Sequence, residues 1–133
     1  MPAHICIALF IPVFQVHGNT DAACTARNAA RCLIAFRAPP HIRVHPGASK
    51  PLLLSARHDP EIHGEDGLQG AEGLPDANSA EVKALMATDS DGLPIRALEG
   101  MAQSIRTTWN NGAGYQVTVI STGPMTNIGR IIR

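Results

Sequence analysis

Continuous apolar runs alternate along this chain with stretches whose apolar residues recur at helical spacing. Residues 5–16 form an apolar run, and residues 21–36 carry apolar side chains at every third or fourth position. The two patterns return later, with helical spacing over residues 94–109 and a β-branched run over residues 115–121. Such runs predict strands, and a period of 3.6 predicts amphipathic helices. Their alternation indicates an α/β fold, with a partial, open, mostly parallel sheet flanked by helices.

Turn and capping residues mark where these elements begin and end. Thr20 or Asp21 can cap the first helix by accepting a hydrogen bond from a first-turn amide, and Pro39 ends it. A short strand is expected over residues 42–45, where Ile and Val alternate with Arg and His. Asn and Gly residues over 110–114 end the later helix.

The stretch from residue 49 to residue 94 breaks this pattern. Prolines and glycines punctuate it, and only a short helix near residues 80–87 is expected within it. So long a stretch with little regular structure usually belongs to a functional loop or to disorder. Because 133 residues fit one domain, we expect a single domain over residues 1–133 that is largely loop between residues 49 and 94.

The charge balance excludes several kinds of partner. Lys and Arg number 11, and so do Asp and Glu, so no excess charge attracts nucleic acid or an anionic membrane. No apolar stretch reaches the roughly 18 residues needed to span a bilayer. We therefore expect neither nucleic acid nor membrane as a partner.

The cysteines bear on the cellular compartment. Cys6, Cys24 and Cys32 form no C-x-x-C pair, so neither a disulfide framework nor a zinc site is indicated. Free thiols fit a reducing compartment, and the expected location is cytoplasmic. A small secreted module is the alternative, suggested by the apolar run over residues 5–16. However, no Lys or Arg precedes that run, and Pro12 interrupts it.

Two polar turns occupy the position where open α/β sheets bind their ligands, beyond the carboxyl ends of the strands. Residues 17–19 (HGN) follow the first expected strand, and residues 121–127 (STGPMTN) follow the last. We expect the two turns to lie at the same edge of the sheet and to contribute to one site.

Four sequence motifs, taken together, resemble a known enzyme family. They are VHGN, VHPGASKPLL, IHGEDGLQG and STGPMTNIG, beginning at residues 16, 44, 62 and 121. Their order and wording resemble the inosine–uridine-preferring nucleoside hydrolases, most of all the fungal uridine or ribonucleoside hydrolases. The resemblance implies a Rossmann-like nucleoside hydrolase fold and hydrolysis of ribonucleosides of the uridine or inosine type to ribose and free base. It also implies a calcium cofactor and homo-oligomeric assembly.

The resemblance assigns roles to three residues. Asn19 matches the motif Asn that reaches the ribose near the metal, and Thr122 matches the residue whose backbone carbonyl ligates calcium. His63 matches the motif His near the leaving base, where protonation could help departure. Each has a simpler interpretation from the residues alone. Asn is common in turns, His63 could be a solvated surface side chain, and a carbonyl ligand leaves almost no sequence trace.

The departures from the family pattern bear on activity. A D-x-D-P-G-x-D-D cluster opens the family's chains and supplies calcium ligands and the general base, but this sequence contains none. A counterpart of the family's C-terminal half is missing as well. We therefore expect a fragment or truncated gene product, with impaired activity and with calcium weakly bound or absent. The alternative is a non-catalytic remnant that only associates with other subunits or binds ribose weakly. The base preference stays open.

Overall fold

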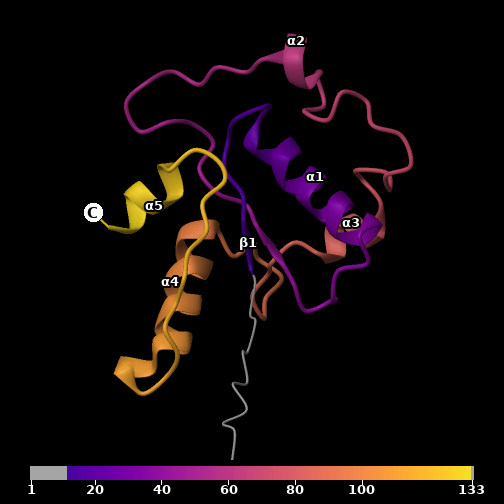
Figure 1. The fold of residues 1–133 in the computed structure, drawn as a ribbon. Helices are drawn as coiled ribbons and strands as arrows, with labels where there is room; N and C mark the ends of the chain where they lie inside the picture. Colours follow the sequence, from indigo (N-terminus) through magenta and orange to yellow (C-terminus); the bar gives the residue numbers. More distant parts are fainter. Residues whose placement is uncertain (1–11, 133) are drawn as a thin grey trace, which may run out of the picture.

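The computed structural model describes residues 12–132 and forms a small parallel sheet with helices around it (Figure 1). Residues 5–11 of the apolar run expected as a strand lie outside the described residues. The elements in chain order are β1 (Val13–Phe14), α1 (Ala22–Ala35), β2 (Val44–His45), α2 (Pro60–His63), α3 (Ala80–Ala84), α4 (Ala97–Trp109), the 3-10 turn η1 (Asn110–Gly112) and α5 (Thr126–Ile131).

The sheet is parallel and open, as the alternation of periods predicted. Strand β1 pairs with β2 in parallel, with Val13 opposite Val44 and Phe14 opposite His45. The far side of β2 makes a parallel bridge between Val44 and Met86. A third stretch of chain therefore extends the sheet from within the region expected to be largely loop. The prediction of a partial α/β fold is confirmed.

Helix α1 begins and packs as its sequence predicts. The carboxylate of Asp21 accepts a hydrogen bond from the backbone N–H of Cys24 at 2.7 Å, which caps the helix. The buried side chains of Ala26 and Ala30 pack with Val44 and Val82 in the core. Because alanine adds little bulk, the helix backbone lies close to the sheet, and the core needs no large aromatic side chain.

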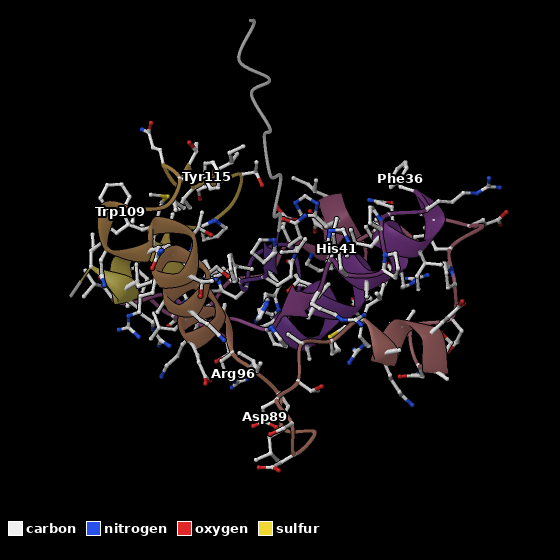
Figure 2. All side chains as sticks on the ribbon, turned by 90° about the horizontal axis from the view of Figure 1, so that it is seen from below. Phe36, His41, Asp89, Arg96, Trp109 and Tyr115 are labelled. Carbon is white, nitrogen blue, oxygen red and sulfur yellow. The ribbon has the colours of Figure 1, made fainter. Side chains whose placement is uncertain are left out.

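The large aromatic side chains lie mostly at the surface. Figure 2 shows Trp109 and Tyr115 near the end of α4, while Phe36 lies on the other side of the molecule, at the end of α1. Phe36 is 84% exposed, Tyr115 64% and Trp109 51%. Burial in this chain therefore depends on small aliphatic residues, each of which contributes little apolar area.

Helix α4 packs against the sheet next to His45. It begins at Ala97, three residues after the start expected at residue 94. Ala97, Gly100 and Met101 are its buried residues. A Cβ atom on Gly100 would overlap the imidazole ring of His45, so a residue without a side chain is needed for this close approach. Among the described helices, none combines the length and the hydropathy needed to cross a bilayer.

The prediction of a strand over residues 115–121 is wrong for this structure. The segment runs from the end of α4 alongside β1 toward α5 (Figure 1). Tyr115 donates its backbone N–H to the carbonyl of Thr108 at 2.8 Å, but residues 116–123 make no backbone–backbone hydrogen bond to another described residue. A cavity of about 290 Å³ separates the segment from β1. A strand requires a neighbouring backbone at hydrogen-bonding distance, and none of the described chain supplies one.

Candidate functional site

Three loops meet at the carboxyl ends of the strands. The backbone N–H of His17, just after β1, donates to the carbonyl of Ala48, just after β2, at 2.9 Å. Gly18 faces Pro124, whose ring would lie 3.8 Å from a Cβ atom on the glycine. The HGN turn and the STGPMTN turn are therefore neighbours, as expected for an open α/β sheet.

Asn127 links the ends of β1 and β2 through both ends of its amide. Its Nδ2 donates to the carbonyl of Gln15 at 2.8 Å, and its Oδ1 accepts the N–H of Ala48 at 3.0 Å. The Asn127 side chain is buried. Its two hydrogen bonds connect the ends of the two strands in the way that a backbone hydrogen bond of the sheet would. Gly47 packs against this amide, and a Cβ atom there would overlap both Gln15 and Asn127. No role for Asn127 follows from the sequence alone, because an Asn in a turn is too common to be informative.

His17 joins the first turn to the start of α5. Its Nε2 lies 3.1 Å from the hydroxyl oxygen of Thr126, and both side chains are buried. Burial lowers the pKa of His17 below 6.5, and the nearby His58 lowers it further. The imidazole is therefore neutral near pH 7 and holds Thr126 in place rather than carrying a charge.

The loop after α2 docks onto the first turns of α1. The carbonyl of Asp66 accepts hydrogen bonds from the side chain of Asn28, at 2.6 Å, and from the thiol of Cys24, at 3.2 Å. The hydroxyl of Thr20 donates to the carbonyl of Glu65 at 3.3 Å. These contacts bring the HGEDG motif against the helix that follows the VHGN turn.

Two features give the docked loop its shape. Gly67 has φ +75°, and a Cβ atom there would lie 2.6 Å from the methyl carbon of Thr20, so both conformation and space require glycine. The carboxylate of Asp66 accepts the backbone N–H groups of Leu68 and Gly70 at 2.9 and 3.1 Å. These two bonds lower the pKa of Asp66.

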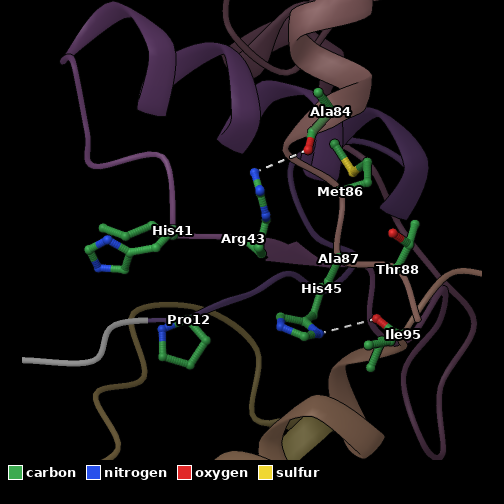
Figure 3. Close-up of a pocket in the computed structure, with 10 residues that line it drawn as sticks. Pro12, His41, Arg43, His45, Ala84, Met86, Ala87, Thr88 and Ile95 are labelled. Carbon is green, nitrogen blue, oxygen red and sulfur yellow. Dashed lines mark hydrogen bonds between the residues drawn. The ribbon is translucent and has the colours of Figure 1, made fainter. Parts of the chain in front are cut away.

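A second cavity, of about 320 Å³, lies near the amino ends of the strands (Figure 3). His45 lines it and faces the carbonyl of Ile95 from Nδ1 at 3.2 Å, while Arg43 donates to the carbonyl of Ala84 at 3.1 Å. Burial lowers the pKa of His45, although the Ile95 carbonyl and Glu99 act in the opposite direction. The side chains of His45 and Arg43, two of the four polar side chains that line this cavity, thus already serve the fold.

Comparison with known proteins shows which fold family these loops belong to. The family model of the inosine-uridine preferring nucleoside hydrolases matches residues 8–133. The chain belongs to this family. It is 31% identical over 120 residues to an uncharacterized protein of Schizosaccharomyces pombe. The aligned residues make up 90% of this chain and 31% of that protein.

Bacterial nucleoside hydrolases give the same result. The chain is 32% identical over 115 residues to the pyrimidine-specific ribonucleoside hydrolase RihA of Salmonella paratyphi B, over 86% of this chain and 31% of RihA. RihA of Salmonella agona matches equally well. The chain thus spans about a third of the length of these curated relatives.

The residues matched to nucleoside hydrolase roles lie on adjoining loops. Asn19 and Thr122 are exposed, on the two turns that meet at Gly18 and Pro124. His63 is half-buried at the end of α2, on the loop that docks beside Thr20. None of the three side chains hydrogen-bonds to another described residue. Their roles therefore remain predictions from the family resemblance.

The described residues by themselves do not fit the calcium site of a nucleoside hydrolase. Within residues 12–132, no three His, Cys, Asp or Glu side chains form a group suited to a metal ion. Of the carboxylates near the loops, that of Asp21 caps α1 and that of Asp66 accepts two backbone amides. Calcium takes six to eight oxygen ligands, and the turns offer mainly carbonyl, amide and hydroxyl oxygens.

Proposed function

We propose that the loops at the carboxyl ends of the strands belong to a site that hydrolyses the N-glycosidic bond of ribonucleosides, giving ribose and free base. Family membership supports the reaction class. The observation that carries the proposal is the meeting of the VHGN and STGPMTN turns, where Gly18 faces Pro124. The proposed substrates are of the uridine or inosine type, and RihA, one of the relatives, is named pyrimidine-specific.

Hydrolysis of a ribosyl C–N bond requires exposed polar groups at the two turns. Breaking the ribosyl C–N bond develops positive charge on the sugar, as in glycoside hydrolysis generally. In our proposal the Asn19 amide hydrogen-bonds the ribose hydroxyls, and the Thr122 backbone carbonyl would be one oxygen ligand of calcium if the ion were bound. His63 lies toward the leaving base, where a proton would aid its departure.

We further propose that the 133-residue chain alone is a poor catalyst that binds calcium weakly. One carbonyl and one amide supply few of the oxygens that calcium needs, and no carboxylate compensates its charge. A general base for the attacking water is also needed, and such groups contribute roughly 10²–10⁴-fold to rate. Asp21 and Asp66, two of the nearby carboxylates, already accept backbone hydrogen bonds.

A non-catalytic role is the second candidate. Residues 116–123 make no backbone–backbone hydrogen bond to another described residue, and a cavity adjoins them. Both observations favour a chain that associates with other subunits. Homo-oligomeric assembly, as in the family, is part of this proposal. Weak binding of ribose would be compatible with it.

One experiment tests these proposals together. Release of uracil from uridine, and of hypoxanthine from inosine, is followed with millimolar calcium beside RihA, while NMR records the amides of residues 17–19 and 121–124. We expect turnover at least about a hundredfold below that of RihA, because the general base is missing, and uridine-dependent shifts confined to the two turns. Turnover within about tenfold of RihA would show that Asp21 or Asp66 acts as the base. Unchanged amides at saturating uridine would refute the site.

A further inference from the structure

Asn111 and Gly112, in η1, form the centre of the tight turn that follows helix α4. Asn111 has φ 52° and ψ 34°, and Gly112 has φ +87°. The backbone N–H of Ala113 donates to the carbonyl of Asn110 at 3.0 Å. These features describe a type I′ turn, in which both central residues have positive φ and Asn-Gly is a preferred pair. The turn lies at the lower end of α4 in Figure 1, and both central residues are exposed.

Two further hydrogen bonds close the chain around this turn. The N–H of Gly114 donates to the carbonyl of Trp109 at 3.0 Å, and the N–H of Tyr115 donates to the carbonyl of Thr108 at 2.8 Å. Gly114 lies so close to the helix end that a Cβ atom there would overlap the Thr108 carbonyl. The geometry of the turn therefore decides where the segment over residues 115–124 leaves α4.

An asparagine followed by glycine is also a chemically reactive pair. The backbone nitrogen of the glycine attacks the side-chain carbonyl carbon of the asparagine, and the new N–Cγ bond closes a succinimide ring. The Cγ–Nδ2 bond breaks, and ammonia leaves with the proton of the attacking nitrogen. Water then opens the ring at either carbonyl, which gives aspartate or isoaspartate. Glycine favours the attack, because no Cβ atom restricts the backbone rotation that the attack requires.

Asn111 meets these conditions better than the other asparagines of the chain. It is the one asparagine that glycine follows, and its side chain is exposed. Asn127, by contrast, is buried with both ends of its amide hydrogen-bonded. Asn78 is exposed as well, but it precedes Ser79, whose backbone N–H donates to the carbonyl of Asp76 at 3.0 Å. Asn78 is therefore a matched internal control.

We propose that Asn111 is a deamidation site of the folded chain, and that its isoaspartate product releases the segment that follows α4. Isoaspartate routes the backbone through the former side chain and so adds a methylene to it. Loop length selects the turn type, so an extra backbone atom is incompatible with this turn. The hydrogen bonds of the Gly114 and Tyr115 amides are then lost, and the residues leading to the STGPMTN turn become more mobile. The aspartate product only adds negative charge at the C-terminal end of α4, where the helix dipole disfavours it.

The chemical step is tested by ageing the intact chain at mildly alkaline pH and locating the conversion of amide to acid by peptide mass spectrometry. Conversion at Asn111 should be at least about tenfold faster than at Asn78. The variant Asn111→Gly has no side-chain amide and still suits a positive φ, so the turn should form and residue 111 should stay unmodified. Equal rates at Asn111 and Asn78 would overturn the proposal.

Hydrogen exchange tests the structural consequence on the isoaspartate form, separated from the parent chain by ion exchange. The amides of Gly114 and Tyr115 should exchange at least about tenfold faster in this form than in the fresh chain. Aged Asn111→Gly should keep the protection of both amides, and Asn111→Asp should lose less of it than the isoaspartate form. Unchanged protection of the two amides in the isoaspartate form, or an equal loss of protection throughout α1, would refute release of the segment.

Discussion

Helix α1 with its docked loop and the segment over residues 115–121 differ in how the hydrogen bonds of their backbones are completed. The helix closes its own backbone hydrogen bonds, its cap comes from the adjacent Asp21, and side chains over 20–28 hold the loop. The other segment has β-branched residues, but residues 116–123 make no backbone–backbone hydrogen bond to another described residue. Local sequence suffices for a helix, whereas a strand depends on a neighbour that may be far away in the chain.

The largest expected effect is at Asn127, the residue that follows the unpaired segment and joins the ends of β1 and β2. In Asn127→Ala, the carbonyl of Gln15 and the N–H of Ala48 lose their partner in a buried place. Each unsatisfied group costs about 1–3 kcal/mol, so unfolding free energy should fall by about 2–4 kcal/mol. Urea unfolding measures it, with the exposed Asn78→Ala as control. A loss equal to that of the control would show that the amide does not stabilise the strand ends.

A pair of valine truncations compares the two regions directly. Val82 is fully buried between α1 and the sheet, whereas Val119 is 48% exposed. Val82→Ala should cost about 2 kcal/mol, from lost burial and the cavity left behind, and Val119→Ala no more than about 0.5 kcal/mol in the monomer. Both losses of unfolding free energy are measured by urea titration at low protein concentration. Equal losses would mean that the segment is packed as firmly as the core.

The cap of α1 should contribute less. Asp21→Ala removes the acceptor for the Cys24 amide, and such substitutions cost about 1 kcal/mol. The control is Asp91→Ala, an exposed turn residue with no side-chain hydrogen bond to another described residue. Helix ellipticity and urea midpoints report the difference. Loss of the cap should also speed hydrogen exchange in the first turn of α1, because its amides lose a partner.

The smallest effect concerns pH. The pKa of His17 is lower in the folded chain than its usual 6.5, so its contribution to stability is complete above about pH 6.5 and is lost as the pH falls below that value. His45 shifts in the same direction and adds to the slope. The carboxyl of Asp66, with a pKa below 3.8, acts only in more acid solution.

The variant His17→Gln should therefore flatten the fall in unfolding free energy between about pH 7.5 and 5.5, since one titrating group is removed. His41→Gln, at an exposed position, should keep the slope of the parent chain. Urea unfolding at several pH values decides between them. An unchanged slope in His17→Gln would assign the acid sensitivity to His45 alone.

The sequence predicted most of what is locally determined. The Asp21 cap, the extents of α1 and α4 to within three residues, and the meeting of the two polar turns follow from spacing, capping and the geometry of parallel sheets. The Asn127 amide, the His17–Thr126 contact and the fit of Gly100 against His45 could not be predicted, because each joins residues distant in sequence through contacts that leave no periodic signal. The strand over 115–121 failed for the same reason, since its partner could not be inferred from its own residues.

The anchoring of both ends of the stretch between α4 and α5 affects the entropy of ordering it. At one end, Tyr115 is hydrogen-bonded to Thr108, and at the other Asn127 is bonded to Gln15 and Ala48. The closure entropy of this loop has therefore already been lost in the folded monomer. Fixing the intervening residues requires only the local backbone entropy of about 1–2 kcal/mol per residue. If these residues became a strand, a few backbone hydrogen bonds and apolar contacts would need to offset only this local backbone entropy.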